Sequence, residues 1–225
     1  MGTPRTPKGR IKAISVQLAV DYPEALCELD HRNAFELLAA TILSAQTTDA
    51  RVNMVTPALF ARYPNAAALA GATPADLEEI VRSTGFYQSK ARNLVTMAQS
   101  LLDRFGGEVP TALEDLVTLA GVGRKTANVV RSVAFGLPGL PVDTHVGRLT
   151  RKWALTTQDD PVKVEAELCA LLPPTEWGDF SLRTILHGRR VCDAKKPRCG
   201  TCNIEALCPA SLLPRGPSKR AAVAT

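Results

Sequence analysis

The chain has 225 residues, of which 45% are hydrophobic and 5% aromatic, which is enough apolar material for one large or two small domains with a buried core. Its formal net charge is +5, and the basic charge concentrates at the C-terminal end, where residues 181–225 hold nine Lys and Arg against two Asp and Glu. Because no run of eighteen apolar residues occurs and no apolar signal core follows the basic N-terminus, we expect no membrane span and a cytoplasmic protein.

The first part of the chain reads as a series of helices. Residues 1–10 have prolines and charges but no periodicity, so we expect them to be disordered. The stretch FELLAATILS, residues 35–44, is almost wholly apolar and predicts a buried helix. Asp49 is the expected cap of the next helix, over residues 50–63. Strand patterns are nearly absent and alanine and leucine are abundant, so we predict an all-α fold.

A sequence repeat follows. PADLEEIVRSTGFYQSKA, from residue 74, aligns with PTALEDLVTLAGVGRKTA, from residue 110, at a constant offset of 36 residues. Each copy predicts a short helix that begins at the proline, a turn at the glycine and a second helix. We infer two related helix-turn-helix units in tandem. The first copy has Ser89 where the second has Lys125, so we expect its turn to serve another purpose.

The second copy contains LAGVGRKTANVV, residues 119–130. Gly121 and Gly123 predict a tight turn, because glycine takes positive φ without steric cost. Arg124 then begins a helix whose free N–H groups and partial positive charge suit an anion such as a phosphate. The pattern resembles the helix-hairpin-helix of DNA repair glycosylases, and it places Lys125 at the mouth of a phosphate-binding turn.

Four cysteines near the C-terminus, Cys192, Cys199, Cys202 and Cys208, form the pattern C-x6-C-x2-C-x5-C. In a cytoplasmic protein they indicate a metal or cluster rather than disulfides. Structural zinc usually uses two short cysteine pairs, and only the central pair is short here, so the spacing leans toward a [4Fe–4S] cluster and leaves zinc open. Residues 211–225 are expected to be disordered. The basic C-terminal end indicates a polyanionic partner or a merely solvated tail.

Several stretches in this order resemble the endonuclease III family. They are LSAQTTD (43–49), LAGVGRKTANVV, PVDTH (141–145), HGR (187–189) and the cysteine pattern. Each stretch is weak alone, but their order and the eighteen-residue separation of Lys125 from Asp143 are specific. The resemblance extends from about residue 27 to Cys208.

The resemblance implies a two-domain, all-α helix-hairpin-helix glycosylase fold with DNA in the cleft between the domains. A six-helix domain would span residues 27–137, and a cluster domain would combine residues 1–26 with residues 138–225. The resemblance also makes a [4Fe–4S] cluster the expected cofactor, with zinc a minor alternative.

The resemblance further implies a reaction. Lys125 would attack C1′ of the deoxyribose of an oxidised pyrimidine flipped out of duplex DNA, expel the base and form a Schiff base, and β-elimination would cut the strand. Asp143 would accept the amine's proton and assist departure of the base. Asp143 also reads as the N-cap of a helix over 144–153, and the two roles are compatible. We expect Arg124, the helix N-terminus and desolvation to favour the neutral amine that attack requires.

The family also predicts DNA contacts. Gln46 matches a glutamine that fills the hole left by the flipped base. Phe86 stands where the family has a wedging leucine, so Phe86 could wedge, stack on a base, or pack against Tyr87 or the core. His145 would line the pocket, or be a core or surface histidine. The other expected contacts are the hairpin residues Gly121, Val122, Gly123 and Arg124 and the basic loop residues Lys195, Lys196 and Arg198.

The residues leave other functions open. An adenine glycosylase of the same superfamily normally lacks a lysine at the position of Lys125. A non-catalytic DNA-binding module would bind with steep salt dependence. An electron-transfer protein would use the cluster alone. We predict a monomeric, nucleoid-associated base excision repair enzyme, a bifunctional glycosylase and AP lyase, whose partner is double-stranded DNA with damaged pyrimidines or abasic sites.

Overall fold

The computed structural model describes residue 4 and residues 6–214 of the chain. All regular secondary structure among these residues is helical, which confirms the all-α prediction. The α-helices are α1 (Pro7–Asp21), α2 (Ala34–Leu43), α3 (Asp49–Arg62), α4 (Ala66–Ala70), α5 (Pro74–Val81), α6 (Tyr87–Phe105), α7 (Leu113–Leu116), α8 (Arg124–Val129), α9 (Thr144–Lys152), α10 (Pro161–Leu171) and α11 (Trp177–Arg190). Shorter helical segments are η1 (Arg82–Thr84), η2 (Val130–Ala134), η3 (Pro174–Glu176), η4 (Cys199–Thr201) and η5 (Glu205–Leu207).

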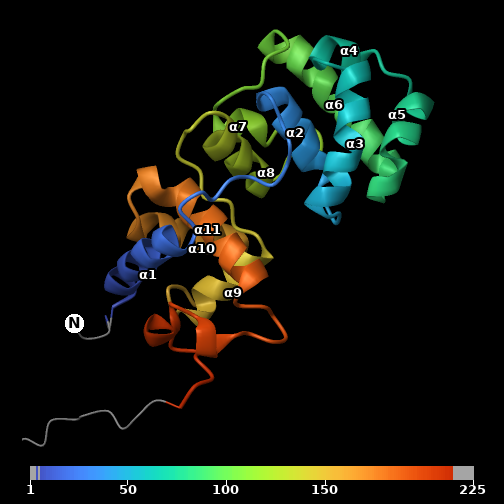
Figure 1. Cartoon of the computed structure of the whole chain (residues 1–225). Helices are drawn as coiled ribbons and strands as arrows, with labels where there is room; N and C mark the ends of the chain where they lie inside the picture. The colour runs from blue at the N-terminus through green and yellow to red at the C-terminus, as the bar shows by residue number, and fades with distance from the viewer. Residues whose placement is uncertain (1–3, 5, 215–225) are drawn as a thin grey trace, which may run out of the picture.

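The helices form two lobes (Figure 1). Helices α2–α8 make the first lobe, and α1 joins α9–α11 and the C-terminal loops in the second. Each lobe has its own hydrophobic core: the first draws its buried residues from 29–130, and the second from 11–22 and 140–204. The described residues therefore form two cores, and the domain boundaries stay a prediction.

Helix α1 differs from the expectation of a disordered N-terminus. Residues 7–10 form its first turn, because Thr6 caps the helix by accepting a hydrogen bond from the Gly9 amide at 3.2 Å and a proline suits the first helical position. Its buried residues, which include Ile11 and Ile14, pack in the second core. The prediction of disorder is therefore wrong for residues 7–10. Residues 1–3, 5 and 215–225, for which disorder was also predicted, lie outside the described residues.

Helices α2 and α3 pack against each other in the first lobe. Every residue of α2 from Phe35 to Leu43 is buried, which confirms the prediction of a buried helix. Helix α3 begins one residue earlier than predicted. Its cap is Thr48, which accepts a hydrogen bond from the Arg51 amide at 3.3 Å, and Asp49 is instead the first helical residue.

The two copies of the repeat fold as two helix-turn-helix units. Gly85 and Gly121 occupy aligned positions, and both have positive φ, +68° and +76°, in the region that favours glycine. Gly123 differs, because it is extended with φ of −90° and serves as the N-cap of α8. Only the first glycine of the hairpin therefore needs its special conformational freedom.

The prolines that open the two copies behave differently. Pro74 begins α5 as predicted, whereas Pro110 lies three residues ahead of Leu113, the first residue of α7. The intervening segment is not helical, and the Arg131 guanidinium donates to the Thr111 carbonyl within it. The prediction of a helix that begins at the second proline is therefore wrong.

Candidate active site and cysteine pocket

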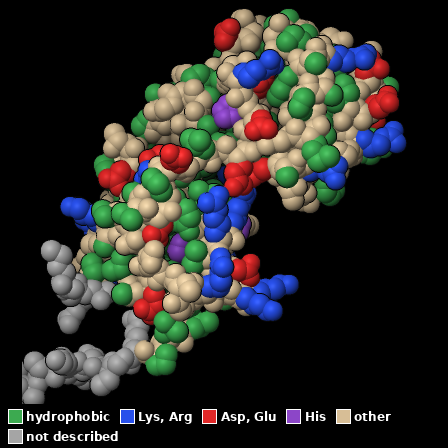
Figure 2. Space-filling view, in the orientation of Figure 1, with side chains coloured by type: hydrophobic (Ala, Val, Ile, Leu, Met, Phe, Trp, Pro, Cys, Tyr) green, Lys and Arg blue, Asp and Glu red, His purple; other side chains and the backbone are tan. Residues whose placement is uncertain are grey.

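A cavity of about 770 Å³ lies between the lobes, and both residues predicted to be catalytic line it. Lys125 is the second residue of α8 in the first lobe, and Asp143 directly precedes α9 in the second. Gln46 and His145 line the same cavity. The surface is hollowed where the lobes meet, and Lys and Arg side chains gather along the border of the hollow (Figure 2). An amine and a carboxylate thus share one cleft.

The hairpin turn presents backbone rather than side chains. Gly121 is closely packed, since a Cβ there would lie 3.0 Å from Asn93 Nδ2 and 3.2 Å from Ile42 Cγ2. Gly123 has open space on its Cβ side. Val122 between them is 6% exposed and belongs to the first core. A DNA contact at Val122 is therefore limited to its backbone.

Arg124 makes an ion pair that the sequence did not reveal. Its Nε and Nη2 donate to the two carboxylate oxygens of Glu165 on α10, at 2.8 and 2.9 Å, and the pair joins the two lobes. These hydrogen bonds raise the pKa of Arg124. Because the Glu165 carboxylate offsets the guanidinium charge, Arg124 adds less positive charge beside Lys125 than we expected. Lys125 itself is exposed, so its desolvation requires that DNA cover it.

Asp143 is the N-cap of α9, as predicted. Its Oδ1 accepts a hydrogen bond from the Val146 amide at 2.8 Å, and this bond leaves the second carboxylate oxygen for other chemistry. His145 is half-buried, with Nδ1 3.3 Å from Arg148 Nη2. Burial lowers the pKa of His145, which favours a neutral imidazole beside the carboxylate.

Arg189 lines the cleft, although the sequence analysis gave it no role. It extends from α11, donates to Asp49 Oδ2 at 3.0 Å and pairs with Glu28. Although burial opposes the shift, these carboxylates and that of Asp143 raise the pKa of Arg189. Arg189 therefore stays protonated in the cleft, where the carboxylates of Asp49 and Glu28 offset its charge. The HGR motif was the signal that pointed to this residue.

Gln46 and Phe86 lie in two turns of the first lobe, one after α2 and one before α6. Both have left-handed φ, +54° and +48°, which is uncommon for residues other than glycine and costs about 1–3 kcal/mol. Both are exposed, Phe86 to 69%, so the alternative that Phe86 packs into the core is wrong. Gln46 lines the cleft, whereas Phe86 is absent from its lining.

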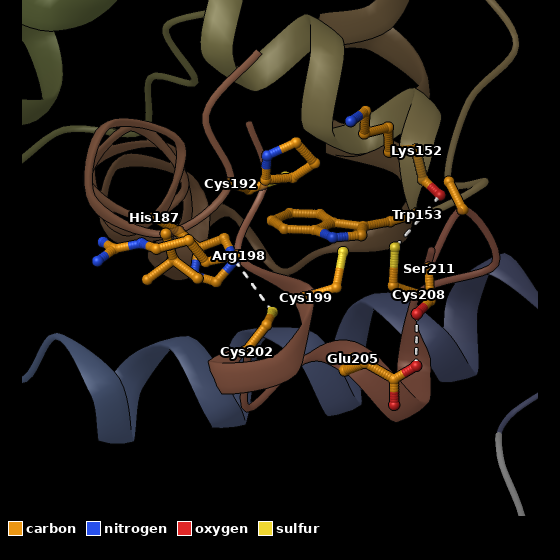
Figure 3. A pocket seen from close by; sticks show the side chains of 13 residues that line it. Lys152, Trp153, His187, Cys192, Arg198, Cys199, Cys202, Glu205, Cys208 and Ser211 are labelled. Atoms are coloured by element: carbon orange, nitrogen blue, oxygen red, sulfur yellow. Dashed lines mark hydrogen bonds between the residues drawn. The ribbon is translucent and has the colours of Figure 1, made fainter. Parts of the chain in front are cut away.

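The four predicted cysteine ligands line one pocket of the second lobe, together with Trp153 and His187 (Figure 3). His187 Nε2 lies 3.5 Å from Cys202 Sγ. Burial raises the pKa of Cys202 to about 11, and the neighbouring cysteines add to the shift. Thiolates in this pocket therefore need the positive charge that a metal centre supplies.

The four thiols share this pocket without forming a closed site for a single ion. Among the described residues, no three His, Cys, Asp or Glu side chains converge closely enough to hold one metal ion. A tetrahedral zinc site with Zn–S bonds of about 2.3 Å needs sulfur atoms about 3.8 Å apart. The structure therefore places four thiols in one pocket, and the group that they would hold stays a prediction.

The loop between the first two cysteines carries the predicted basic side chains. Asp193 shapes this loop, because its Oδ1 accepts hydrogen bonds from the amides of Lys195 at 2.8 Å and Lys196 at 3.0 Å, which lower the pKa of Asp193. The side chains of Lys195, Lys196 and Arg198 are exposed, and Arg198 also lines the cysteine pocket. Their role as DNA contacts stays a prediction.

A family model and several relatives match most of the chain. The model of the HhH-GPD superfamily base excision DNA repair protein matches residues 39–174. Endonuclease III of Synechocystis sp. is 50% identical over 205 residues, which are 91% of this chain and 94% of the relative. The chain belongs to the endonuclease III family. Endonuclease III of Bacillus subtilis is 43% identical over 83% of this chain and 86% of the relative.

Solved structures of endonuclease III agree with this fold. A non-covalent endonuclease III–DNA complex superimposes with a TM-score of 0.86 and 43% identity, and covers 91% of this chain and 96% of the other. A trapped covalent intermediate of endonuclease III with DNA gives the same TM-score of 0.86. In the part of the chain that the structure describes, no helix has the length and apolar character needed to cross a membrane.

The predicted site residues of this chain lie in three places. The cleft brings together Gln46, Lys125, Asp143 and His145, and the hairpin Gly121–Arg124 adjoins Lys125 in the chain. The cysteine pocket holds the four thiols and Arg198. Phe86, Lys195 and Lys196 line neither, which leaves them as exposed residues of the surrounding surface.

Proposed function

We propose that this chain excises oxidised pyrimidines from duplex DNA and cuts the strand at the resulting abasic site, with Lys125 as nucleophile and Asp143 as its acidic partner. The combined DNA glycosylase and AP lyase activity is that of the endonuclease III family, to which the chain belongs. One observation carries the residue assignment: an exposed amine and a half-buried carboxylate line the same cleft. A relative trapped as a covalent intermediate with DNA supports a nucleophilic route.

The chemistry begins with a base turned out of the duplex, at a cost of a few kcal/mol that is smaller for a damaged pair. The neutral Lys125 amine forms a bond to C1′ while the N-glycosidic bond breaks, and the base leaves with its electron pair. Asp143 takes the proton from the amine, and its negative charge stabilises the positive charge that develops on the sugar. The C1′–O4′ bond then breaks as the lone pair of the nitrogen forms the C=N bond of the Schiff base, and O4′ takes up a proton. Loss of a proton from C2′ then expels the 3′ phosphate by β-elimination, which cuts the strand.

The cleft and its surroundings also suit a DNA partner. Gln46 is exposed on the cleft wall, where it can occupy the space left by the base, and Phe86 is exposed on a neighbouring turn. Arg189 and the backbone amides of the hairpin would meet phosphates. We expect such a protein to act at the bacterial nucleoid as a cytoplasmic monomer.

The cofactor that best fits the cysteine pocket is a [4Fe–4S] cluster held by Cys192, Cys199, Cys202 and Cys208. The supporting observations are that the four thiols line one pocket and that only Cys199 and Cys202 form a short pair of the kind that structural zinc uses twice. When bound, the cluster supplies Fe–S bonds that cross-link the C-terminal loops. Those loops carry Lys195, so the cluster would shape the basic surface, while the reaction depends on the separate cleft.

Reductive trapping tests the proposal. With a thymine glycol duplex and borohydride, the wild-type protein should become covalently joined to DNA, and Lys125→Ala should not. Lys163→Ala, which removes an exposed lysine on α10, is the matched control and should trap normally. If the Lys125→Ala variant still forms the adduct, Lys125 is not the nucleophile. A wild-type protein that neither traps nor releases a base would reject the function, and activity on adenine opposite 8-oxoguanine instead would favour the adenine glycosylase.

A further inference from the structure

Lys90 is a buried lysine that the proposed chemistry does not use. It lies in the first turn of α6 and is 4% exposed. Its Nζ donates to the Thr84 carbonyl at 2.7 Å and to Thr47 Oγ1 at 2.9 Å. Burial lowers the pKa of Lys90, and within residues 6–214 no carboxylate pairs with it. An ammonium group buried without a counter-charge is costly, so its surroundings require an explanation.

The two partners of Lys90 belong to the two turns that carry Gln46 and Phe86. Thr47 directly follows Gln46, and Thr84 lies two residues before Phe86. Thr47 Oγ1 also donates to the Thr84 carbonyl, so an ammonium, a hydroxyl and a carbonyl form one network. This network joins turns that are 37 residues apart in the chain.

The repeat explains why this lysine points inward. Lys90 aligns with Thr126, one position after the place of Lys125. One residue along an α-helix rotates the side chain by about 100°. In the second unit the lysine is exposed on the cleft, and in the first unit it is buried beneath the turn. The lysine of the first copy therefore lies in a different environment from Lys125, on a unit that has Ser89 at the place of Lys125.

We propose that Lys90 is a positioning residue that fastens the Gln46 and Phe86 turns to each other, so that both side chains enter the duplex as one unit when a base is turned out. The inference rests on the proposed function, because it concerns a step of that reaction. Both turns hold a non-glycine residue at positive φ, and such a conformation persists only where the surroundings over-determine it. The Lys90 network is the contact that the two turns share.

Lys90→Met tests this role, because methionine keeps an unbranched side chain and removes the charge and the donors. Base release from a thymine glycol duplex should fall at least about tenfold, since residues in one hydrogen-bond network couple by roughly 2- to 150-fold. β-Elimination on single-stranded abasic DNA, which needs no base extrusion, should stay within about twofold. The fluorescence rise of 2-aminopurine placed opposite the lesion should also shrink. Lys12→Met, an exposed lysine on α1, is the control and should change none of these.

A double-mutant cycle separates positioning from a general loss of stability. In a Phe86→Ala background, Lys90→Met should lower the rate of base release from duplex DNA much less than it does in the wild type, because the turn has already lost the Phe86 side chain that it positions. Equal losses on both substrates, or independent effects in the cycle, would overturn the proposal. If Lys90→Met does not fold, Thr47→Val takes its place in the test. A loss of activity confined to the duplex substrate supports the proposal, and any other result overturns it. A wild type without base release would instead count against the proposed function.

Discussion

Arg124→Leu and Glu165→Leu together test the ion pair that joins α8 to α10. Glu165 is 8% exposed, whereas the Arg124 side chain is 45% exposed. Removing the arginine leaves a buried carboxylate unpaired, which typically costs about 3–5 kcal/mol when both partners are buried. Because Arg124 is nearly half exposed, we expect about 2 kcal/mol. Removing Glu165 leaves a guanidinium that water reaches, and the expected loss is below about 1 kcal/mol.

The assay is urea unfolding of the holoenzyme followed by far-UV circular dichroism. The double variant should resemble Glu165→Leu, because neither variant leaves a buried charge without a partner. Equal losses in the two single variants, or a double-variant loss equal to their sum, would refute the reasoning.

The Arg124–Glu165 ion pair leads to a second prediction, which concerns DNA binding. Glu165→Leu releases the Arg124 guanidinium beside the hairpin, where it can contact a phosphate. Each added phosphate contact should steepen the slope of log affinity against log salt concentration by about 0.9. A slope equal to or shallower than that of the wild type would mean that Arg124 does not face DNA.

The remaining predictions concern the cleft, the wedge and the cysteine pocket. Asp143→Asn keeps an acceptor for the amide of Val146, so the free energy of unfolding should change by less than about 1 kcal/mol. The rate of base release should fall by about 10²–10⁴-fold. An undiminished rate would exclude the acid–base role of Asp143. Phe86→Ala should lower base release from duplex more than cleavage of single-stranded abasic DNA, and equal losses would argue against a wedge. Cys199→Ser should lower the iron content and the midpoint of thermal unfolding, and an unchanged iron content would remove this cysteine from the ligand set.

The features that the sequence predicted well depend on local patterns. Helix α2 is a continuous apolar run, and a ten-residue run of that kind buries itself in any compact fold. Gly85 and Gly121 align in the repeat because both turns need positive φ, which few other residues adopt. The cysteine spacing likewise brought four thiols to one pocket, because all four lie within a stretch of seventeen residues, 192–208.

The features that the sequence missed depend on partners far along the chain. Arg124 reads as a free cation until α10 brings Glu165 beside it, 41 residues later. Arg189 meets Asp49 across 140 residues, which no local pattern encodes. Lys90 has the same charge and flanking residue types as many surface lysines, so its burial follows only from the packing of the two turns. Tertiary contacts, not propensity, decided these cases.

Helix α1 has a consequence for the order in which the protein assembles. Ser15 of α1 donates to Glu176 at 2.9 Å, and 161 residues separate the two. At about 5–20 residues per second of synthesis, the N-terminal helix waits roughly 8–30 s before that partner emerges from the ribosome. Meanwhile α2–α8 can close on contacts nearer in sequence, which form faster. A nascent chain arrested before α10 would therefore display the apolar stripe of α1, a target for chaperones and a nucleus for aggregation.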